Sequence, residues 1–375
     1  MSTIQANAIL DASGGNTTTI NGVTPNTNTV RGRNLIINGD MRIDQRNGGA
    51  AVSTANGYIL DRWTLAKYGP GGGAYSGQQV SDAPDDFDHS LKVTVTTSTA
   101  GTVNDYWQAF QTIEGFNSKH LKWGTSAAKT VTVSFWVKSS VTGTYSFAFY
   151  NNGFNSGNRA LATTYTINSA NTWEYKTLTI SGDGTAGASY WGTTNTQGVG
   201  CYWDLGCGDN QNIPADTWTS SNARRVAGTV KLINTANATW QITGVKLEVG
   251  SVATEFDHRS YGEELALCQR YYQVLDTGRL MSIGNGSGYS NGSTTLPVSL
   301  RAAASVSYVY QNGSNFAGYS GMSGTQVAYT CTNYSSGAED FQLRYNFNNT
   351  NDVYVYWHDL GTTTDQLIIK IDAEL

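Results

Sequence analysis

Short runs in which apolar and polar residues alternate recur along most of the chain, separated by segments rich in Gly, Asn and Ser. The clearest runs are residues 91–95, 131–137 and 145–149, in which every second side chain is Leu, Val, Tyr or Phe. A period of two places these side chains on one face of a β-strand. The pattern therefore predicts antiparallel strands with one buried face, as in a β-sandwich.

Other segments predict strands less cleanly. In residues 173–181 the aromatic positions fall out of phase with the aliphatic ones, which indicates a bulge or an edge strand. Residues 228–234 predict one further strand, with Val230 and Leu232 on one face. Towards the C-terminus, strands of a second sandwich are predicted within residues 296–311, 342–347, 352–360 and 366–375.

The run at residues 240–249 changes phase in its middle. Trp240 and Ile242 face the same side as Val245 and Leu247 only if one extra residue is accommodated at Gly244. An extra residue in a strand is a β-bulge, and Gly is the residue that adopts its conformation most readily. We therefore expect a bulge at Gly244.

Beyond residue 258 the period changes from that of a strand to that of a helix. Apolar residues recur at spacings of four, three, four and three, at Tyr261, Leu265, Cys268, Tyr272 and Leu275. This spacing predicts a helix with an apolar seam over residues 258–276. Ser260 and Glu263 have the spacing of a capping box at its start. The seam suits a helix packed on its own domain and a helix packed on a trimer axis equally well.

Residues 1–32 contain few large apolar side chains and many Asn and Thr residues. Such a segment cannot bury a core by itself, so we expect an extended arm that orders on assembly. The predicted fold is all-β, with two antiparallel sandwiches joined by one helix and preceded by this arm. The predicted boundaries are 1–32 for the arm, 33–257 for the first sandwich, 258–276 for the helix and 277–375 for the second sandwich.

Composition narrows the possible functions. Only 14% of the 375 residues are charged, against about a quarter in an average protein, and the net charge is −5. With no basic stripe to neutralise phosphates, nucleic-acid binding is not expected. No segment approaches the roughly 20 apolar residues of a membrane span, and the N-terminus has no signal-peptide pattern, so neither membrane insertion nor export is expected.

Two short motifs resemble catalytic ones but stand in the wrong context. Residues 288–292 match the G-x-S-x-G pattern around Ser290, and Asp352 and His358 follow in the order of a hydrolase. The motif requires a strand-to-helix turn, whereas the residues after Ser290 predict a strand. Gly72 and Gly77 have P-loop spacing, but no Lys follows them. We therefore predict no catalytic residues.

No cofactor or metal is predicted. The Asp residues between Asp82 and His89 lack the ordered spacing of a calcium loop and are more typical of a solvated turn. The remaining histidines show no zinc spacing. Four cysteines are too few for a disulfide framework. Free thiols are therefore expected, although Cys201 and Cys207 are close enough in sequence to bridge.

Four segments resemble recurrent sequences of tailed-phage virion proteins. NLIINGDM and LDRW, which follow the N-terminal arm, resemble the start of the jelly-roll, carbohydrate-binding-like domain of many phage fibres. ITGVKLEVG and ELALCQRYY, around residues 242–272, resemble a segment common in tail-fibre and adhesin-like proteins. The resemblance covers roughly residues 33–275, with its two ends in the expected order.

The resemblance implies a non-enzymatic virion protein, a tail fibre or similar appendage, that assembles in the host cytoplasm. It implies a homotrimer, attachment to other virion proteins through the arm, and adhesion to a host-surface glycan. A head fibre or capsid decoration protein is the alternative among structural proteins. A glycan-cleaving tail enzyme is the alternative from another class; its paired carboxylates would meet only in space.

Two groups of aromatic residues are candidates for glycan contact. The first lies in a Gly-, Asn- and Thr-rich stretch of the first sandwich and comprises Tyr190, Trp191, Tyr202, Trp203 and Trp218. Flat rings stack on sugar faces, but the same rings also fill cores and interfaces, which we consider the better explanation for this group. The second lies in predicted long loops of the C-terminal sandwich and comprises Tyr289, Tyr319 and Tyr334. We expect adhesion there, because such loops resemble antibody paratopes in composition.

Overall fold

The structure is a computed structural model. It describes residues 34–53, 56–153, 157–276, 281–284, 289–302, 305–310, 317–320, 325–328, 330–336, 340–346, 355–357 and 367–374. The predicted arm, residues 1–32, lies outside the described residues.

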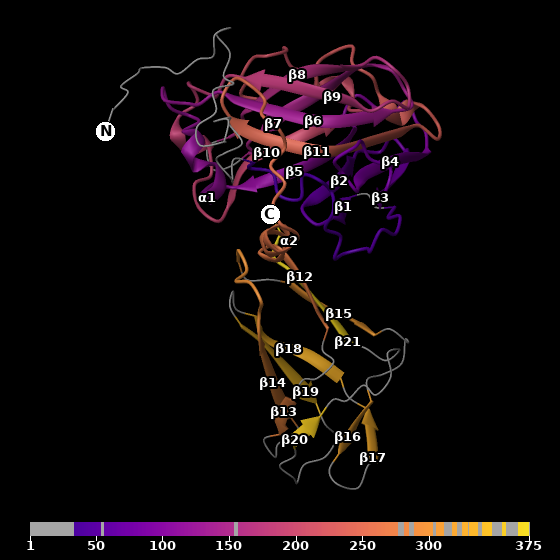
Figure 1. The fold of residues 1–375 in the computed structure, drawn as a ribbon, viewed down its shortest axis with the longest axis vertical. Helices are drawn as coiled ribbons and strands as arrows, with labels where there is room; N and C mark the ends of the chain where they lie inside the picture. Colours follow the sequence, from indigo (N-terminus) through magenta and orange to yellow (C-terminus); the bar gives the residue numbers. More distant parts are fainter. Residues whose placement is uncertain are drawn as a thin grey trace, which may run out of the picture.

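The first domain is a sandwich of two antiparallel sheets (Figure 1). The six-stranded sheet has the order β1 (Asn56–Leu60), β2 (Trp63–Tyr68), β5 (Tyr106–Glu114), β10 (Gln197–Asp204), β7 (Gly143–Tyr150) and β8 (Ala160–Ile167). The five-stranded sheet has the order β3 (Ala74–Val80), β4 (Ser90–Thr97), β11 (Thr239–Val249), β6 (Val131–Ser139) and β9 (Glu174–Ile180). The prediction of an all-β fold is confirmed.

The core of this domain lies between the two sheets, where the alternating residues predicted it. The apolar positions of residues 91–95, 131–137 and 145–149 are all buried. Trp203 lies in this core, with its ring 5.5 Å from that of Trp63 and 5.0 Å from that of Phe147. The hydrophobic effect of burying this face is what selects the register of each strand, because a slip by one residue would expose it.

Of the two segments with less regular patterns, residues 173–181 form a strand and residues 228–234 do not. β9 is an edge strand, as its broken alternation indicated. The strand predicted at residues 228–234 is wrong, because this segment contains a 3-10 turn, η5 (Leu232–Asn234). Leu232 and Ile233 are buried in succession, which a strand with one buried face cannot achieve.

The predicted bulge at Gly244 is confirmed. The register between β11 and β6 shifts between Thr243 and Lys246, and Gly244 has a φ of 60°. A Cβ atom at this position would lie 2.7 Å from the ring of Phe87. Gly244 is therefore required both by the backbone conformation and by the space available.

We expect Gly244→Ala to lower the free energy of unfolding by about 2 kcal/mol, because a left-handed backbone costs an L-residue about 1–2 kcal/mol and the Phe87 ring must also shift. Chemical denaturation followed by tryptophan fluorescence measures this change. Gly262→Ala is the matched control. Gly262 lies in a helix with open space around it, so that substitution should raise stability by about 0.5–1 kcal/mol. Equal effects at the two sites would contradict the role assigned to the bulge.

The linker helix, α2 (Tyr261–Gln269), is shorter than the predicted residues 258–276. Its capping box is confirmed, with the Ser260 side chain accepting from the Glu263 amide and the Glu263 carboxylate accepting from Ser260. Tyr272 and Leu275, predicted on the helical seam, belong instead to strand β12 (Tyr272–Asp276). The chain leaves the helix because β12 pairs along its length with β21 (Leu367–Asp372), which no local pattern reveals.

Part of the predicted seam packs within the chain. Cys268 is buried in a small cluster with Ile37, Ile43 and Tyr271, and Leu265 packs against this cluster. Tyr272 is also buried, whereas Tyr261 is largely exposed. These contacts match the interpretation of a helix packed on its own domain. The homotrimer stays a prediction.

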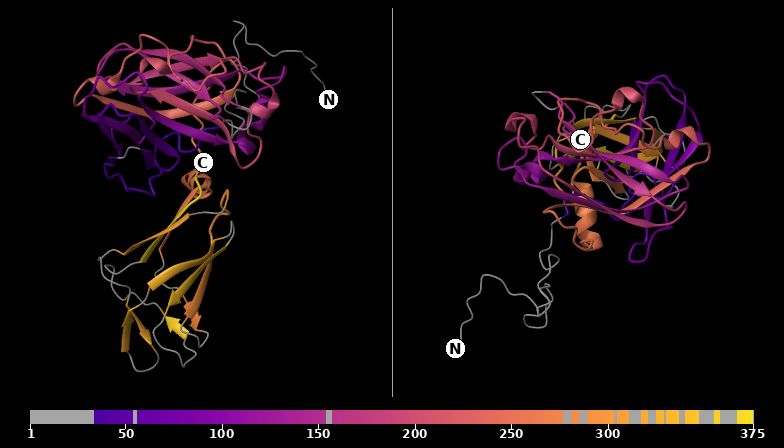
Figure 2. Two further views of the ribbon diagram at one scale, coloured as in Figure 1. Left: turned by 180° about the vertical axis from the view of Figure 1, so that it is seen from behind. Right: turned by 90° about the horizontal axis from the view of Figure 1, so that it is seen from above.

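The second domain extends away from the first, with α2 and the C-terminus between them (Figures 1 and 2). One sheet comprises β12, β21 and β15 (Ser305–Tyr310). A five-stranded sheet has the order β18 (Thr330–Ser336), β19 (Asp340–Asn346), β14 (Tyr289–Thr295), β13 (Met281–Gly284) and β20 (Val355–Trp357), and a hairpin joins β16 (Ala317–Ser320) to β17 (Thr325–Ala328). Of the helices that the structure describes, none is both long and apolar enough to span a bilayer.

Candidate functional site

The aromatic residues predicted in the first domain lie mainly in its interior. Trp203 is fully buried, and Trp191 and Tyr202 are nearly so. Tyr190 and Trp218 are partly buried and pack against the core. Trp191 and Trp203 have no ring face free for a ligand. Both rings therefore fill the core, which is the explanation that the sequence favoured.

The tyrosines predicted in long loops of the second domain lie on strands instead. Tyr289 begins β14, Tyr319 lies in β16 and Tyr334 lies in β18. The expectation of long loops at these three positions is therefore wrong, because the strands that contain them pair with neighbouring strands. Their side chains lie outside the described residues, and their role in adhesion stays a prediction.

The hydrolase-like motif is also part of a sheet. Ser290 lies in β14 and pairs with Gly284 on one side and Tyr345 on the other. It is not at the strand-to-helix turn that nucleophilic catalysis by this motif requires. Asp352 and His358 lie outside the described residues.

A different group of aromatic side chains covers the outer face of the six-stranded sheet. Tyr68 on β2 stacks on Tyr106 of β5, with ring centroids 5.4 Å apart and planes 17° apart. Phe110 of β5 stacks in the same way on Tyr202 of β10, at 4.8 Å. Both pairs are direct cross-strand partners in the register of the sheet. Pairing of the strands therefore creates a row of rings on this face.

The segment between β10 and β11 folds back over part of this row. Its residues Ile213 and Ala223 are buried against the same face as Tyr150 and Tyr202. Arg224 follows, and its guanidinium lies over three rings, 4.7 Å from the centroid of Tyr150, 5.0 Å from Tyr202 and 5.2 Å from Tyr106. These distances are typical of cation–π contacts.

A pocket of about 360 Å³ remains open beside this segment. It is lined by three tyrosines, one arginine and four amides, namely Tyr68, Tyr106, Tyr150, Arg224, Asn104, Asn152, Gln211 and Asn222. Tyr68 is 61% exposed and presents its ring to solvent. Flat rings beside amides suit a sugar, whose C–H face stacks while its hydroxyls form hydrogen bonds.

The hydroxyl of Tyr150 is neutral at ordinary pH. Burial raises its pKa, and the nearby charge of Arg224 offsets only part of this effect. The hydroxyl donates to the Asn158 side-chain oxygen at 2.7 Å. None of the residues that line this pocket is acidic. Glycoside cleavage in most known enzymes needs two carboxylates, which this lining does not supply.

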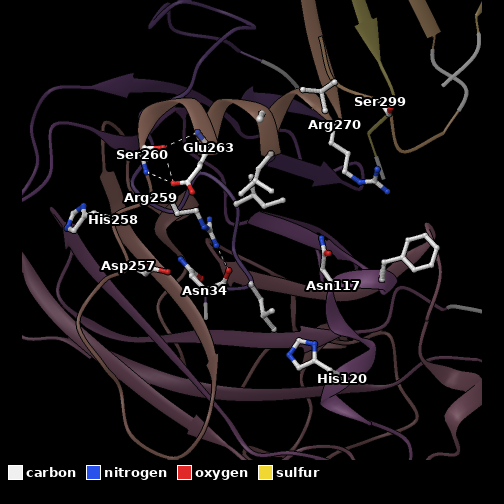
Figure 3. A pocket seen from close by; sticks show the side chains of 16 residues that line it. Asn34, Asn117, His120, Asp257, His258, Arg259, Ser260, Glu263, Arg270 and Ser299 are labelled. Carbon is white, nitrogen blue, oxygen red and sulfur yellow. Dashed lines mark hydrogen bonds between the residues drawn. The ribbon is translucent and has the colours of Figure 1, made fainter. Parts of the chain in front are cut away.

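A larger cavity, of about 1230 Å³, lies between the first domain and α2 (Figure 3). The charged side chains that line it are already used in structural contacts. Arg259 pairs with Glu264 at 3.1 Å and donates to backbone carbonyls near Asn34. Arg270 pairs with Glu114 at 2.7 Å. This cavity is part of the junction that holds α2, and we prefer the tyrosine pocket as the functional site.

Sequence reasoning missed Tyr68, Tyr106, Tyr150 and Arg224, but one signal was available for some of them. Adjacent aromatic residues occur in three strands of the six-stranded sheet, as Tyr106 with Trp107, Phe149 with Tyr150, and Tyr202 with Trp203. In a strand, two neighbouring side chains face opposite sides, so one ring of each pair must lie outside the core.

No model of a known protein family matches the sequence, and none of the curated proteins does. Among solved structures, the chain is similar to the enzymatically active domain of tailspike protein 4 of bacteriophage CBA120, with 16% identity and a TM-score of 0.32 over 58% of this chain and 21% of that one. It is also similar to the family 11 carbohydrate-binding module of the cellulase Lic26A-Cel5E of Clostridium thermocellum, with 13% identity and a TM-score of 0.28 over 56% of this chain and 100% of the module. The xylan-binding module CBM22-2 of Xyn10C from Paenibacillus barcinonensis shows 14% identity and a TM-score of 0.28, over 54% of this chain and 99% of the module. The chain thus spans about a fifth of the tailspike chain that it matches, and these similarities concern architecture alone.

Proposed function

We propose that this chain is a structural protein of a tailed phage, a tail fibre or similar virion appendage, that binds host-surface glycan without cleaving it. The observation that carries the binding role is the stacking of exposed Tyr68 on half-buried Tyr106, beside four amides on the outer face of the sheet. The virion role rests on the sequence segments that resemble phage fibres. Attachment through residues 1–32, a homotrimer and location in the virion belong to the same proposal.

The proposal moves the adhesive site from the second domain to the first. Adhesion by the three tyrosines of β14, β16 and β18 depends on their lying at loop tips, whereas the structure has them in strands. The tyrosine pocket, in contrast, joins exposed ring surface to polar groups within one cavity. Several copies of a weak site on one particle would together give firm adsorption.

We expect Tyr68→Ala to weaken binding to the polysaccharide of a susceptible host about tenfold, since an aromatic contact contributes about 0.5–1.5 kcal/mol and tenfold corresponds to 1.4 kcal/mol. Biolayer interferometry on purified host polysaccharide measures the change. Folding should be unaffected, because Tyr68 is mostly exposed.

Tyr175→Ala is the matched control. Tyr175 is also an exposed strand tyrosine beside another ring, that of Trp136, but it lies on the five-stranded sheet. Its replacement should leave binding unchanged. Unchanged binding in Tyr68→Ala would argue against this pocket as the adhesive site.

A further inference from the structure

Arg224 is a buried cation that has no carboxylate partner among the residues that the structure describes. Its side chain lines the tyrosine pocket, and the residue is only 8% exposed. Within the described part of the chain, none of the ion pairs includes it, and its Nε atom has no hydrogen-bond acceptor. The guanidinium lies over the rings of three tyrosines.

The other buried arginines of the described residues behave differently. Arg62 pairs with Glu374, Arg159 with Asp183 and Arg225 with Asp204. Such pairing is the rule, because an unpaired buried charge is costly. Arg225 directly follows Arg224 in the sequence, yet only Arg225 of these two pairs with Asp204. The faces of the tyrosine rings offset part of the free-energy cost of burying the Arg224 charge. They leave N–H groups of the guanidinium available to an acceptor.

We propose that the pocket recognises an acidic sugar, with the anionic oxygens of the sugar paired to the guanidinium of Arg224. This inference rests on the proposed glycan-binding function and adds the charge class of the ligand. Arginine suits this role because its planar fork matches the two oxygens of a carboxylate, and phosphate or sulfate oxygens offer the same acceptor chemistry.

The surroundings of Arg224 favour an anion. None of the described residues that line the pocket carries a carboxylate, so no acidic group of this lining competes with the ligand for the guanidinium. Asn104 accepts from Asn210 and Asn152 donates to Gln197, and the other side-chain atom of each can serve the hydroxyls of the sugar. The ring of Tyr68 can cover the sugar face. A volume of about 360 Å³ is near the lower end of the usual range of roughly 300–1,000 Å³, which suits one acidic unit of a longer chain.

The test uses surface polysaccharides purified from a panel of bacteria, each in its native form and after carbodiimide-mediated carboxyl reduction. The full-length protein is expected to bind its native polysaccharide about 10- to 100-fold more tightly than the variant Arg224→Gln, the range typical of a charge-assisted hydrogen bond. Arg224→Lys keeps the charge without the fork and should bind between the two. Thermal unfolding of each variant confirms that it is folded.

Lys231→Gln is the matched control. Lys231 lies in the same segment between β10 and β11, but its charge is paired with Asp209. This variant should bind like the unchanged protein. Binding lost both on carboxyl reduction and in Arg224→Gln supports the inference and identifies a carboxylate. Binding that survives reduction but is lost in Arg224→Gln supports it with phosphate or sulfate as the anion.

Equal binding by Arg224→Gln and the unchanged protein, with Tyr68→Ala still impaired, overturns the acidic-sugar inference and leaves the glycan-binding proposal standing. Failure of the unchanged protein to bind any polysaccharide of the panel, in either form, overturns the glycan-binding proposal itself.

Discussion

Replacing Glu374 with Ala is expected to lower the free energy of unfolding of the first domain by about 3–5 kcal/mol, the usual cost of removing one partner from a buried ion pair. Glu374 follows β21, the strand that returns from the second domain. Its carboxylate pairs with Arg62, whose side chain is almost fully buried, and with Arg46 at 3.0 Å. Arg62 also lies 3.6 Å from the centre of the Tyr271 ring. Without Glu374 the charge of Arg62 stays buried and unpaired.

The pKa of Arg62 supports this assignment. Burial by itself lowers that pKa, but the carboxylate of Glu374 and neighbouring groups raise it above its ordinary value. Even without Glu374, Arg62 is expected to stay protonated, because the ordinary pKa of a guanidinium lies far above neutral pH. Chemical denaturation followed by tryptophan fluorescence reports on the first domain, where most tryptophans of the described structure lie.

Asp372→Asn is the matched control for Glu374→Ala. Asp372 also pairs with Arg46, at 2.9 Å, but its side chain is 35% exposed. Pairs open to solvent contribute about 0–1 kcal/mol, so this substitution should have a small effect. A change below 1 kcal/mol in Glu374→Ala would contradict the stabilising role assigned to the buried pair of Arg62 and Glu374.

Asp183→Asn is expected to cost a similar amount, about 3–5 kcal/mol at neutral pH. Asp183 is fully buried and accepts from Nε of Arg159 at 3.0 Å, from Nη2 of Arg159 at 2.8 Å and from the Trp191 indole at 3.2 Å. An Asn side chain has no charge to balance Arg159, and its NH₂ group would face a donor. The pair is therefore broken rather than weakened.

The pH dependence of this effect follows from the pKa of Asp183. Burial raises that pKa, but hydrogen bonds from Arg159 and the Thr185 amide lower it more, so the net shift is below the ordinary value. The folded protein therefore binds the proton less readily than the unfolded chain, whose Asp has a pKa of about 3.9. The stabilisation is present above that value and is lost as the pH falls through the lower pKa of the folded state.

Denaturation of the unchanged protein and of Asp183→Asn between neutral pH and pH 3 tests this directly. The difference in stability should be constant near neutrality and shrink only in the acid range. Asp82→Asn is the control, because Asp82 pairs with Lys138 at an exposed site and should contribute 1 kcal/mol or less. A difference that does not change with pH would contradict the assigned shift.

Local patterns in the sequence determined much of the first domain. The alternation in residues 131–137 identified the buried face of β6, because burial and strand geometry share the period of two. The phase change at Gly244 identified the bulge, and Ser260 with Glu263 identified the start of α2. In each of these cases the pattern that predicted the feature lies within a few residues along the chain.

The tertiary structure alone decided the features that depend on distant partners. Helix α2 ends at Gln269 because the residues that follow pair with β21, about a hundred positions later. Tyr68 and Tyr106 form one surface only because β2 and β5 pair in a particular register. Arg224 and Arg225 are adjacent and have the same side chain, yet in the fold Arg225 pairs with Asp204 whereas Arg224 lies over three tyrosine rings. Sequence patterns predict the local period of an element and its caps. The charge partners and stacked rings of this site depend on long-range strand pairing, which produces no periodic pattern in the sequence.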